Sequence, residues 1–291
     1  MTPLSLGLVL LSAFAHSTWN FLLKRAGHQE VFVWCLLVSA SVLMFPLGTA
    51  LFRLFPIGPN GWWFVLATTI LHIGYFVFLG RGYARGDLSL VYPIARGIGP
   101  MLVPILAVLI LRETIALPAI IGIGAIVVGI YTVSWSGEFS RVLRQPSSIL
   151  RNPGTGYAVL TGLTIAAYAI VDKKGVSLVQ PFLYMYLMTV GAAMGLAPYI
   201  LARWGTSAVV REWRSNAKPI LVASILVFFG YGLVLTAFSM SRVSYVSPAR
   251  EVGIVIGVLM GVFILKERFG TTRIIGSGVV VLGLVLIAFS P

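Results

Sequence analysis

The chain has 291 residues, of which 58% are hydrophobic and 10% are charged, and its formal net charge is +13. Soluble domains typically carry about 25% charged residues, so the composition excludes a water-soluble surface and predicts that lipid covers most of the exterior. The basic residues are scattered through short loops, which is typical of orientation signals in membrane proteins. The charge therefore argues for a membrane partner and against nucleic acid.

Ten segments are apolar enough to cross a bilayer core about 30 Å thick, which takes about 20 residues of helix. Membrane barrel strands would alternate in hydrophobicity with a period of two, and no segment does so. The predicted fold class is an all-α integral membrane protein with ten transmembrane helices, placed in the cell (inner) membrane. The predicted spans are residues 4–23, 30–52, 62–83, 89–111, 117–136, 155–171, 180–202, 218–240, 244–265 and 270–290.

The first span carries His16, Trp19 and Asn20 at the spacing i, i+3, i+4. It is too long and too polar inside to be a cleaved signal peptide, so we expect it to be the first helix of the mature protein. The second span holds Cys35, the one cysteine of the chain. A single cysteine provides no disulfide framework, cysteine-based metal site or redox pair, and we expect no metal and no cofactor.

The third span has one face with polar aromatic residues, and the sixth and eighth spans have comparable faces. Such stripes are more often packing surfaces than binding sites. Tyrosine hydroxyls nevertheless need partners away from lipid, so these faces are expected to turn toward a cavity or a polar helix contact. The residues are His72, Tyr75, Leu79 and Tyr83 in the third span, Tyr157, Thr161, Thr164 and Tyr168 in the sixth, and Phe228, Tyr231, Leu235 and Ser239 in the eighth.

The fourth and ninth spans each contain an arginine, Arg96 and Arg250, about 10 Å from the span end at 1.5 Å per residue. Ionisable residues inside a span are costly and are functional candidates by default. The alternative is that each arginine ties helices together or extends to the near interface. Glu251 would neutralise one arginine or carry a coupling proton, and Asp172 is interpreted as a helix-end pair with Lys173. The substrate-binding candidates are Arg250, Arg96, Tyr75, His72, Trp19, Asn20, Tyr83, Tyr231 and Tyr168.

An internal repeat relates the two halves of the chain at an offset of 154 residues. Ala95-Arg96 matches Ala249-Arg250, and three glycines of the fifth span match three of the tenth. We predict a first repeat at 1–137, a connecting loop at 138–153 and a second repeat at 154–291. Five spans per half invert the second half relative to the first, which is typical of secondary transporters. The matched glycines are Gly122, Gly124 and Gly129 with Gly276, Gly278 and Gly283.

The basic residues also predict the orientation, because cytoplasmic loops carry an excess of lysine and arginine. The odd-numbered loops are much more basic than the even-numbered ones, so we place them in the cytoplasm and both termini outside. The even-numbered loops hold Arg53, Arg112, Lys173, Lys174 and Arg242, and the odd-numbered loops hold Lys24, Arg25, Arg81, Arg85, Arg141, Arg144, Arg151, Arg203, Arg211, Arg214, Lys218, Lys266, Arg268 and Arg273.

These features resemble the EamA-type proteins of the drug/metabolite transporter superfamily. The resemblance rests on the ten spans, the YPIARG start of the fourth span, and the Arg112-Glu113 and Lys266-Glu267 ends of the fourth and ninth spans. HSTWNFLLKR in the first span is similar to a subset with a His-x-x-Trp-Asn pattern. The resemblance implies a central cavity between the third, fourth, eighth and ninth spans and parts of the first and sixth. It also implies export of amino acids and other metabolites.

The function that we expect is secondary active transport, with export of a small amino-acid-like or other carboxylate-bearing metabolite by alternating access. The alternatives are a cationic or multidrug exporter and a lipid-linked sugar flippase. A membrane-embedded enzyme would need a cluster of acids, histidines or metal ligands, and the chain has eight acidic residues and three histidines. The sequence leaves open the substrate, proton coupling, the direction of transport, and whether the protein is a monomer or a homodimer.

Overall fold

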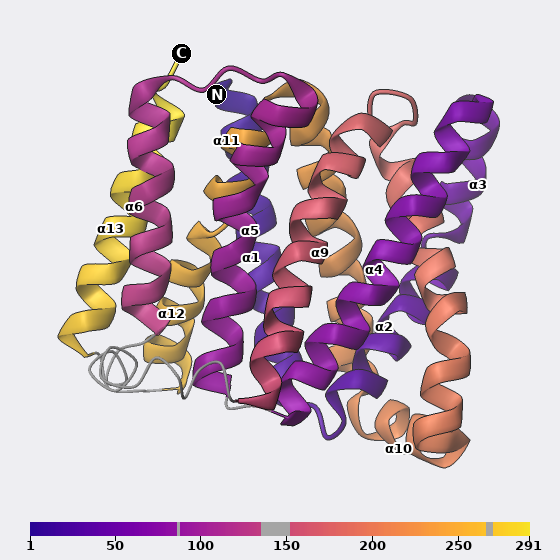
Figure 1. The fold of residues 1–291 in the computed structure, drawn as a ribbon. Helices are drawn as coiled ribbons and strands as arrows, with labels where there is room; N and C mark the ends of the chain where they lie inside the picture. The colour runs from indigo at the N-terminus through magenta and orange to yellow at the C-terminus, as the bar shows by residue number, and fades with distance from the viewer. Residues whose placement is uncertain (86–87, 135–151, 266–269) are drawn as a thin grey trace.

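The computed structural model describes residues 1–85, 88–134, 152–265 and 270–291, and all regular structure in these ranges is helical (Figure 1). The helices run roughly along one axis, and both termini lie at the same end of the bundle. In chain order they are α1 (Pro3–Lys24), α2 (Gln29–Leu43), α3 (Phe45–Leu54), α4 (Pro59–Arg85), α5 (Leu88–Leu111), α6 (Leu117–Ser134), α9 (Pro153–Gly175), α10 (Pro181–Met240), α11 (Val243–Ala249), α12 (Val252–Leu265) and α13 (Thr271–Ala288).

The helices of the described chain account for ten membrane crossings. Eight segments are long and apolar enough to cross individually, and α2 with α3 makes a ninth that bends by 56°. Pro46 opens α3 and has no N–H to continue the preceding helix, which explains why the predicted straight span 30–52 is bent. α10 contains two crossings, because its backbone leaves helical geometry at Gly205 and Asn216. The all-α fold with ten transmembrane helices is therefore confirmed.

The contact between α6 and α13 shows that the two halves are inverted copies. A Cβ atom on Gly122 would lie 2.7 Å from the Gly283 carbonyl oxygen, and one on Gly129 would lie 2.8 Å from the Gly276 carbonyl oxygen. The repeat equates Gly122 with Gly276 and Gly129 with Gly283, so each glycine contacts the counterpart of the other. That crosswise pairing is what a two-fold axis between antiparallel helices produces, and glycine allows the close approach.

The centre of the bundle is enclosed by α1, α4, α5, α9 and α10, with α4 packed on α9 and α1 packed on α10. Phe228, Leu235, Tyr184 and Met185 are fully buried there. Many large apolar side chains on the outer faces of the helices remain exposed, including Leu11, Phe14, Met194, Leu117 and Phe289. An apolar exterior of this extent fits a surface that lipid covers.

The ninth span is broken in its middle, where Arg250 and Glu251 separate α11 from α12. Pro248 has no N–H for the carbonyl four residues earlier. The amides of Glu251 and Ile254 instead bond to carbonyls three residues back, at 3.0 and 2.9 Å. Irregular backbone at membrane depth is tolerated where it lies inside protein or lines a cavity, so the break is a candidate position for contact with a ligand.

The end of the bundle that holds both termini is closed by polar contacts. The Glu113 carboxylate accepts hydrogen bonds from the Val243 and Ser244 amides at 2.9 and 3.1 Å, and from the Ser244 hydroxyl at 2.6 Å. The Met1 amino group donates to the carbonyl of Ser290 at 3.4 Å. These contacts join the end of α5 to the start of α11 and the N-terminus to the C-terminal segment.

Candidate functional site

A cavity of about 70 Å³ lies in the middle of the bundle. Ligand sites for drug-sized molecules usually measure about 300–1,000 Å³, so this cavity is smaller than a typical ligand site. Its polar wall comes from α1, α4, α5, α9, α10 and the break between α11 and α12. The wall includes Arg250, Arg96, Tyr75, His72, Trp19, Tyr231 and Tyr168 from among the candidates, together with His16.

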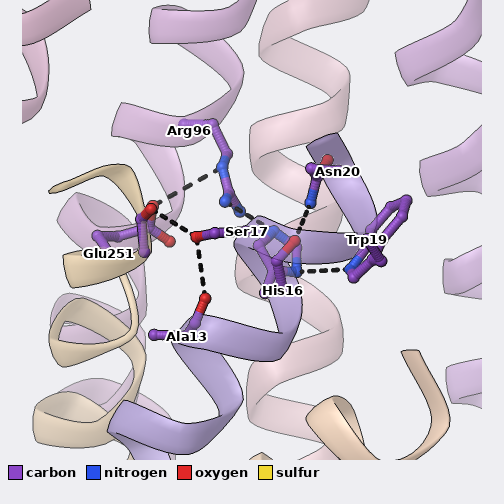
Figure 2. Close-up of polar contacts among 8 residues, drawn as sticks. Ala13, His16, Ser17, Trp19, Asn20, Arg96 and Glu251 are labelled. Atoms are coloured by element: carbon purple, nitrogen blue, oxygen red, sulfur yellow. Dashed lines mark hydrogen bonds and ion pairs between the residues drawn. The ribbon is translucent and has the colours of Figure 1, made fainter. Parts of the chain in front are cut away.

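Arg96 is held between α1 and the broken ninth span (Figure 2). Its Nη2 lies 2.8 Å from His16 Nε2, and its Nε lies 3.7 Å from Glu251 Oε2. Both side chains of this ion pair are largely buried, with 16% and 10% exposed. Glu251 is therefore placed as the neutralising partner of Arg96, and its role as a proton carrier stays a prediction.

His16 receives more donors than it can satisfy. Trp19 Nε1 points at His16 Nδ1 at 3.2 Å while Arg96 points at Nε2 (Figure 2). Trp and Arg side chains only donate hydrogen bonds, and a neutral imidazole accepts at one nitrogen. The neutral ring can thus accept from only one of these two donors at a time, and both Trp19 and Arg96 line the cavity.

One of the candidates lies elsewhere, and one is not described. Asn20 donates from Nδ2 to the carbonyl of His16 at 2.7 Å and is not part of the cavity wall. Tyr83 belongs to α4, but its side chain falls outside the described residues. Sequence spacing put Asn20 on the same face as His16, and its bond to the backbone of its own helix explains why it does not reach the cavity.

Arg250 differs from Arg96 in its contacts. Its Cζ lies 5.1 Å from the centroid of the Tyr231 ring, and the side chain lines the cavity. Within the described ranges it makes no hydrogen bond through its side chain and no ion pair. A cation over an aromatic face is stabilised by the ring quadrupole, but the planar donor fork of the guanidinium stays available to a ligand.

Four rings line the cavity beside Arg250. His72 stacks on Tyr168 with 4.4 Å between centroids, and it meets Tyr231 edge-on at 5.5 Å. Tyr75 and Tyr231 lie 6.0 and 6.1 Å from Tyr168. The ring of His72 is oriented by Thr68, whose carbonyl oxygen lies 2.9 Å from Nδ1. This aromatic cluster presents ring faces that suit an ammonium or an apolar group.

Asp172 is a functional candidate that the sequence interpretation missed. Its carboxylate is fully buried and accepts hydrogen bonds from the Tyr184 hydroxyl at 3.0 Å and the Tyr231 hydroxyl at 2.5 Å. Lys173 instead donates to the carbonyls of Phe238 and Ser241. The predicted helix-end pair of Asp172 with Lys173 is wrong, because α4 and α10 cover this side of α9.

The stripe on the sixth span contained the signal for this residue. Tyr157, Thr161, Thr164 and Tyr168 recur at intervals of three and four, and four residues beyond Tyr168 is Asp172. Side chains four apart share a helix face, so the polar face continues to the carboxylate. Because two lysines follow Asp172 directly, the sequence favoured a helix-end pair over a continuation of the polar face.

A bundle of ten membrane helices, built as two inverted halves around a polar cavity at a broken helix, is the architecture of a membrane transporter. The model of the EamA-like transporter family matches residues 4–135 and 152–289, and the chain belongs to this family. It is thus a multi-pass membrane protein of the drug/metabolite transporter type, a family of transporters rather than enzymes.

Two further comparisons concern the fold and the curated proteins. A solved structure titled "Crystal structure of protein" aligns with a TM-score of 0.70 at 13% sequence identity, covering 97% of this chain and 95% of its own. At that identity the likeness shows the fold alone. A search of the curated proteins finds no match to this chain.

Proposed function

We propose that this transporter exports small carboxylate-bearing metabolites, amino-acid-like ones foremost, by alternating access to the central cavity. The observation that carries the proposal is Arg250, a guanidinium at a helix break that lines the cavity and has no carboxylate partner among the described residues. Arginine binds carboxylates with two parallel hydrogen bonds, and it stays charged inside a protein. An anionic ligand group is therefore the natural partner of this site.

The rest of the cavity supports an amino-acid-like ligand. The Trp19 indole N–H, which also lines the cavity, suits a second carboxylate oxygen as a hydrogen-bond donor. The aromatic cluster of His72, Tyr75, Tyr168 and Tyr231 suits an amino group through its ring faces. This cluster is also what an exporter of cationic drugs would offer, and that function is the second candidate. Two guanidiniums in the same cavity oppose a ligand that is only cationic.

A route to the cavity is suggested by a second pocket of about 360 Å³ between the α1–α2 connection, α4 and α10. Phe76 lines both this pocket and the central cavity, so movement of one ring would join them. The pocket also contains Arg203 and lies toward the basic loops, which we propose face the cytoplasm. Access from that side fits export, and both termini would lie outside.

The chemical class of the ligand can be tested with matched trios of small molecules. Leucine carries both groups, 4-methylpentanoate only the carboxylate and isopentylamine only the ammonium. A ligand that prefers the native state raises the melting temperature, so leucine and 4-methylpentanoate should stabilise the purified protein and isopentylamine should not. Stabilisation by the amine with none by the two acids would replace this proposal with the cationic-drug exporter.

The role of Arg250 is tested with the Arg250→Gln variant. Hydrogen bonds to charged groups contribute about 1.5–3 kcal/mol, so carboxylate affinity should fall by about tenfold to a hundredfold. Arg242→Gln is a matched control in the same half, since Arg242 contacts Tyr245 and Pro291 at the bundle end. Equal leucine binding and proteoliposome transport in Arg250→Gln and the wild type would remove Arg250 from the site.

Orientation is tested separately with reporters that respond to the compartment, fused to each terminus. Because both termini lie at one end of the bundle, the two reporters should agree. We expect an external signal from both, and a cytoplasmic signal from both would reverse the assignment of the 360 Å³ pocket to the cytoplasmic side.

A further inference from the structure

We propose that Asp172 is a proton-binding site and that its occupancy is linked through Tyr231 to a carboxylate bound at Arg250. The inference rests on the proposed function, because it needs an anionic ligand at Arg250. It adds a proton site on α9 that is separate from the Arg96–Glu251 ion pair. The geometry behind it is one side chain, Tyr231, which touches both groups.

Asp172 is a carboxylate without a cationic partner in the described chain. It is fully buried in a helix that crosses the membrane; it accepts hydrogen bonds from the hydroxyls of Tyr184 and Tyr231, and the side chains of Thr68 and His72 on α4 are close enough to interact with it. An isolated carboxylate is costly to bury, whereas its protonated form is much less so. Two hydroxyl donors offset part of that cost, so both protonation states have physical support at this position.

The charged and titratable groups near Asp172 come from α4, from α10, from its own helix α9 and from the break between α11 and α12. α4 contributes His72, and α10 contributes the two tyrosines. Beyond Tyr231 lies Arg250, and on its own helix Lys173 is engaged with backbone carbonyls of α10. No second carboxylate shares the site within the described residues, so a proton bound here belongs to Asp172.

Tyr231 connects the proton site to the cavity. Its hydroxyl donates to Asp172 Oδ2 at 2.5 Å, in the range of a hydrogen bond to an ionised acceptor, while its ring face contacts Arg250. When Asp172 takes up a proton, the new O–H donates to the Tyr231 oxygen, and the tyrosine's own hydrogen is released to another acceptor. A proton on Asp172 thus changes a hydrogen-bond donor in the cavity wall.

Charge gives the sign of the linkage. One tyrosine ring separates Asp172 from Arg250. For two negative charges about 10 Å apart, Coulomb's law at an effective dielectric constant of about 20 gives a repulsion worth about a tenfold change in affinity. Neutral Asp172 removes that repulsion. Proton and ligand therefore favour each other's binding, and the factor is the same in both directions.

The proton site can be observed directly because the chain contains two aspartates, Asp87 and Asp172. Labelling aspartate side chains with ¹³C gives two carboxyl signals in infrared or NMR spectra, and Asp172→Asn identifies one of them. We expect the Asp172 signal to change protonation state within the pH range in which the purified protein stays folded. A signal that keeps one state across this range overturns the proposal.

The link to Arg250 is tested without any ligand in the same spectra. Arg250→Gln removes the cation behind Tyr231 and should move the pH midpoint of the Asp172 signal by about one unit, equivalent to the tenfold coupling. Tyr231→Phe removes the short hydrogen bond and should also move it. A midpoint unchanged in both variants shows that Asp172 is isolated from the cavity and overturns the linkage.

The consequence for transport is tested in proteoliposomes with ¹⁴C-leucine and ¹⁴C-4-methylpentanoate. Asp172→Asn keeps an acceptor oxygen for one tyrosine hydroxyl and offers an N–H to the oxygen of the other, so exchange of ligand across the membrane should continue while its response to an imposed pH gradient is lost. Glu212→Gln is the matched control, because Glu212 is a buried carboxylate bonded to the His28 amide and Asn216 outside the cavity. It should keep the wild-type response.

The outcomes separate this inference from the proposed function. If neither acid is bound or transported by the wild type, the carboxylate proposal fails, while the spectra still decide whether Asp172 binds a proton linked to Arg250. If both acids are transported and Asp172→Asn responds to the pH gradient as the wild type does, the proton site is refuted and the carboxylate site stands.

Discussion

Arg96 and Arg250 occupy equivalent places in the two halves of the chain, but they are used differently. Arg96 contacts Glu251 and His16, whereas Arg250 contacts the Tyr231 ring and has no carboxylate partner in the described residues. The repeat offset of 154 equates Glu251 with Gly97. The carboxylate that would pair with Arg250 by symmetry is missing, so a single position explains why one arginine ties helices together and the other remains available.

The helices that carry the two arginines also differ, because one is continuous and the other is broken. α5 runs from Leu88 to Leu111, whereas its counterpart breaks into α11 and α12. Gly97 packs against Tyr131, and a Cβ atom there would lie 2.6 Å from the tyrosine hydroxyl. The duplicated scaffold is thus symmetric in topology, and its asymmetry is concentrated where the cavity needs an unpaired cation.

The largest effect on stability is expected from Glu251→Gln. Removing one partner of a buried ion pair leaves an uncompensated charge and costs about 3–5 kcal/mol, and the low end fits a pair that is not fully buried. Arg250→Gln breaks no such pair and loses only the contact with the Tyr231 ring, so it should cost about 1 kcal/mol. Unfolding in detergent, followed by helical circular dichroism, measures both.

The double variant Arg96→Gln/Glu251→Gln completes the cycle for this pair. If the two groups interact, its cost should be smaller than the sum of the single variants. Additive losses, or equal losses for Glu251→Gln and Arg250→Gln, would mean that the two arginines are equivalent after all.

The two halves are alike at the contact between α6 and α13. Substitutions of the glycines in this contact should have the next largest effect on the free energy of unfolding. A Cβ on Gly129 would meet backbone atoms of α13 at 2.8 and 2.9 Å, and a Cβ on Gly276 would meet the Val133 amide nitrogen at 2.8 Å. Backbone cannot move aside as a flexible side chain can, so Gly129→Ala and Gly276→Ala should each cost about 1–3 kcal/mol.

Gly124 is the control for this contact, since no atom lies within 4 Å of a Cβ placed there. Gly124→Ala should stabilise the helix by up to about 1 kcal/mol through the higher helix propensity of alanine. The same unfolding measurement applies. A much larger loss for Gly129→Ala than for Gly283→Ala, its counterpart in the repeat, would show that the two-fold relation at this contact is only approximate.

The sequence was sufficient for the fold, because spans and repeats depend on composition and order. Hydropathy located ten crossings, and the repeat placed Arg96 and Arg250 at corresponding depths. It could not separate the two arginines, because the pairing of Arg96 with Glu251 depends on how closely α5 approaches the broken span. Contacts between residues 155 positions apart are set by packing rather than by local pattern.

Local patterns also misled where two signals competed. The position of Pro248 near the start of the ninth span is typical of a helix's first turn, yet α11 begins five residues earlier and the proline precedes an internal break. Asp172 beside Lys173 resembled a helix-end pair, but tertiary packing buried the acid and turned the lysine away. In both places the decisive information was which helix lies opposite.

The smallest effect is expected where α1 meets the broken span. Ser17 on α1 (Figure 2) has its Oγ 2.6 Å from the Gly253 carbonyl oxygen. Gly99, the counterpart of Gly253 in the repeat, faces the Ile165 side chain instead, and the Cγ2 of Ile165 would lie 2.8 Å from a Cβ atom added to Gly99. A neutral hydrogen bond contributes about 1 kcal/mol, so Ser17→Ala should lose about that much in detergent unfolding. Ile165→Val, which removes the Cδ1 methyl group of this side chain and keeps the Cγ2 that faces Gly99, should cost a similar amount. A loss in Ser17→Ala as large as in Glu251→Gln would show that α1 holds the break in place through Ser17 rather than through the ion pair of Arg96.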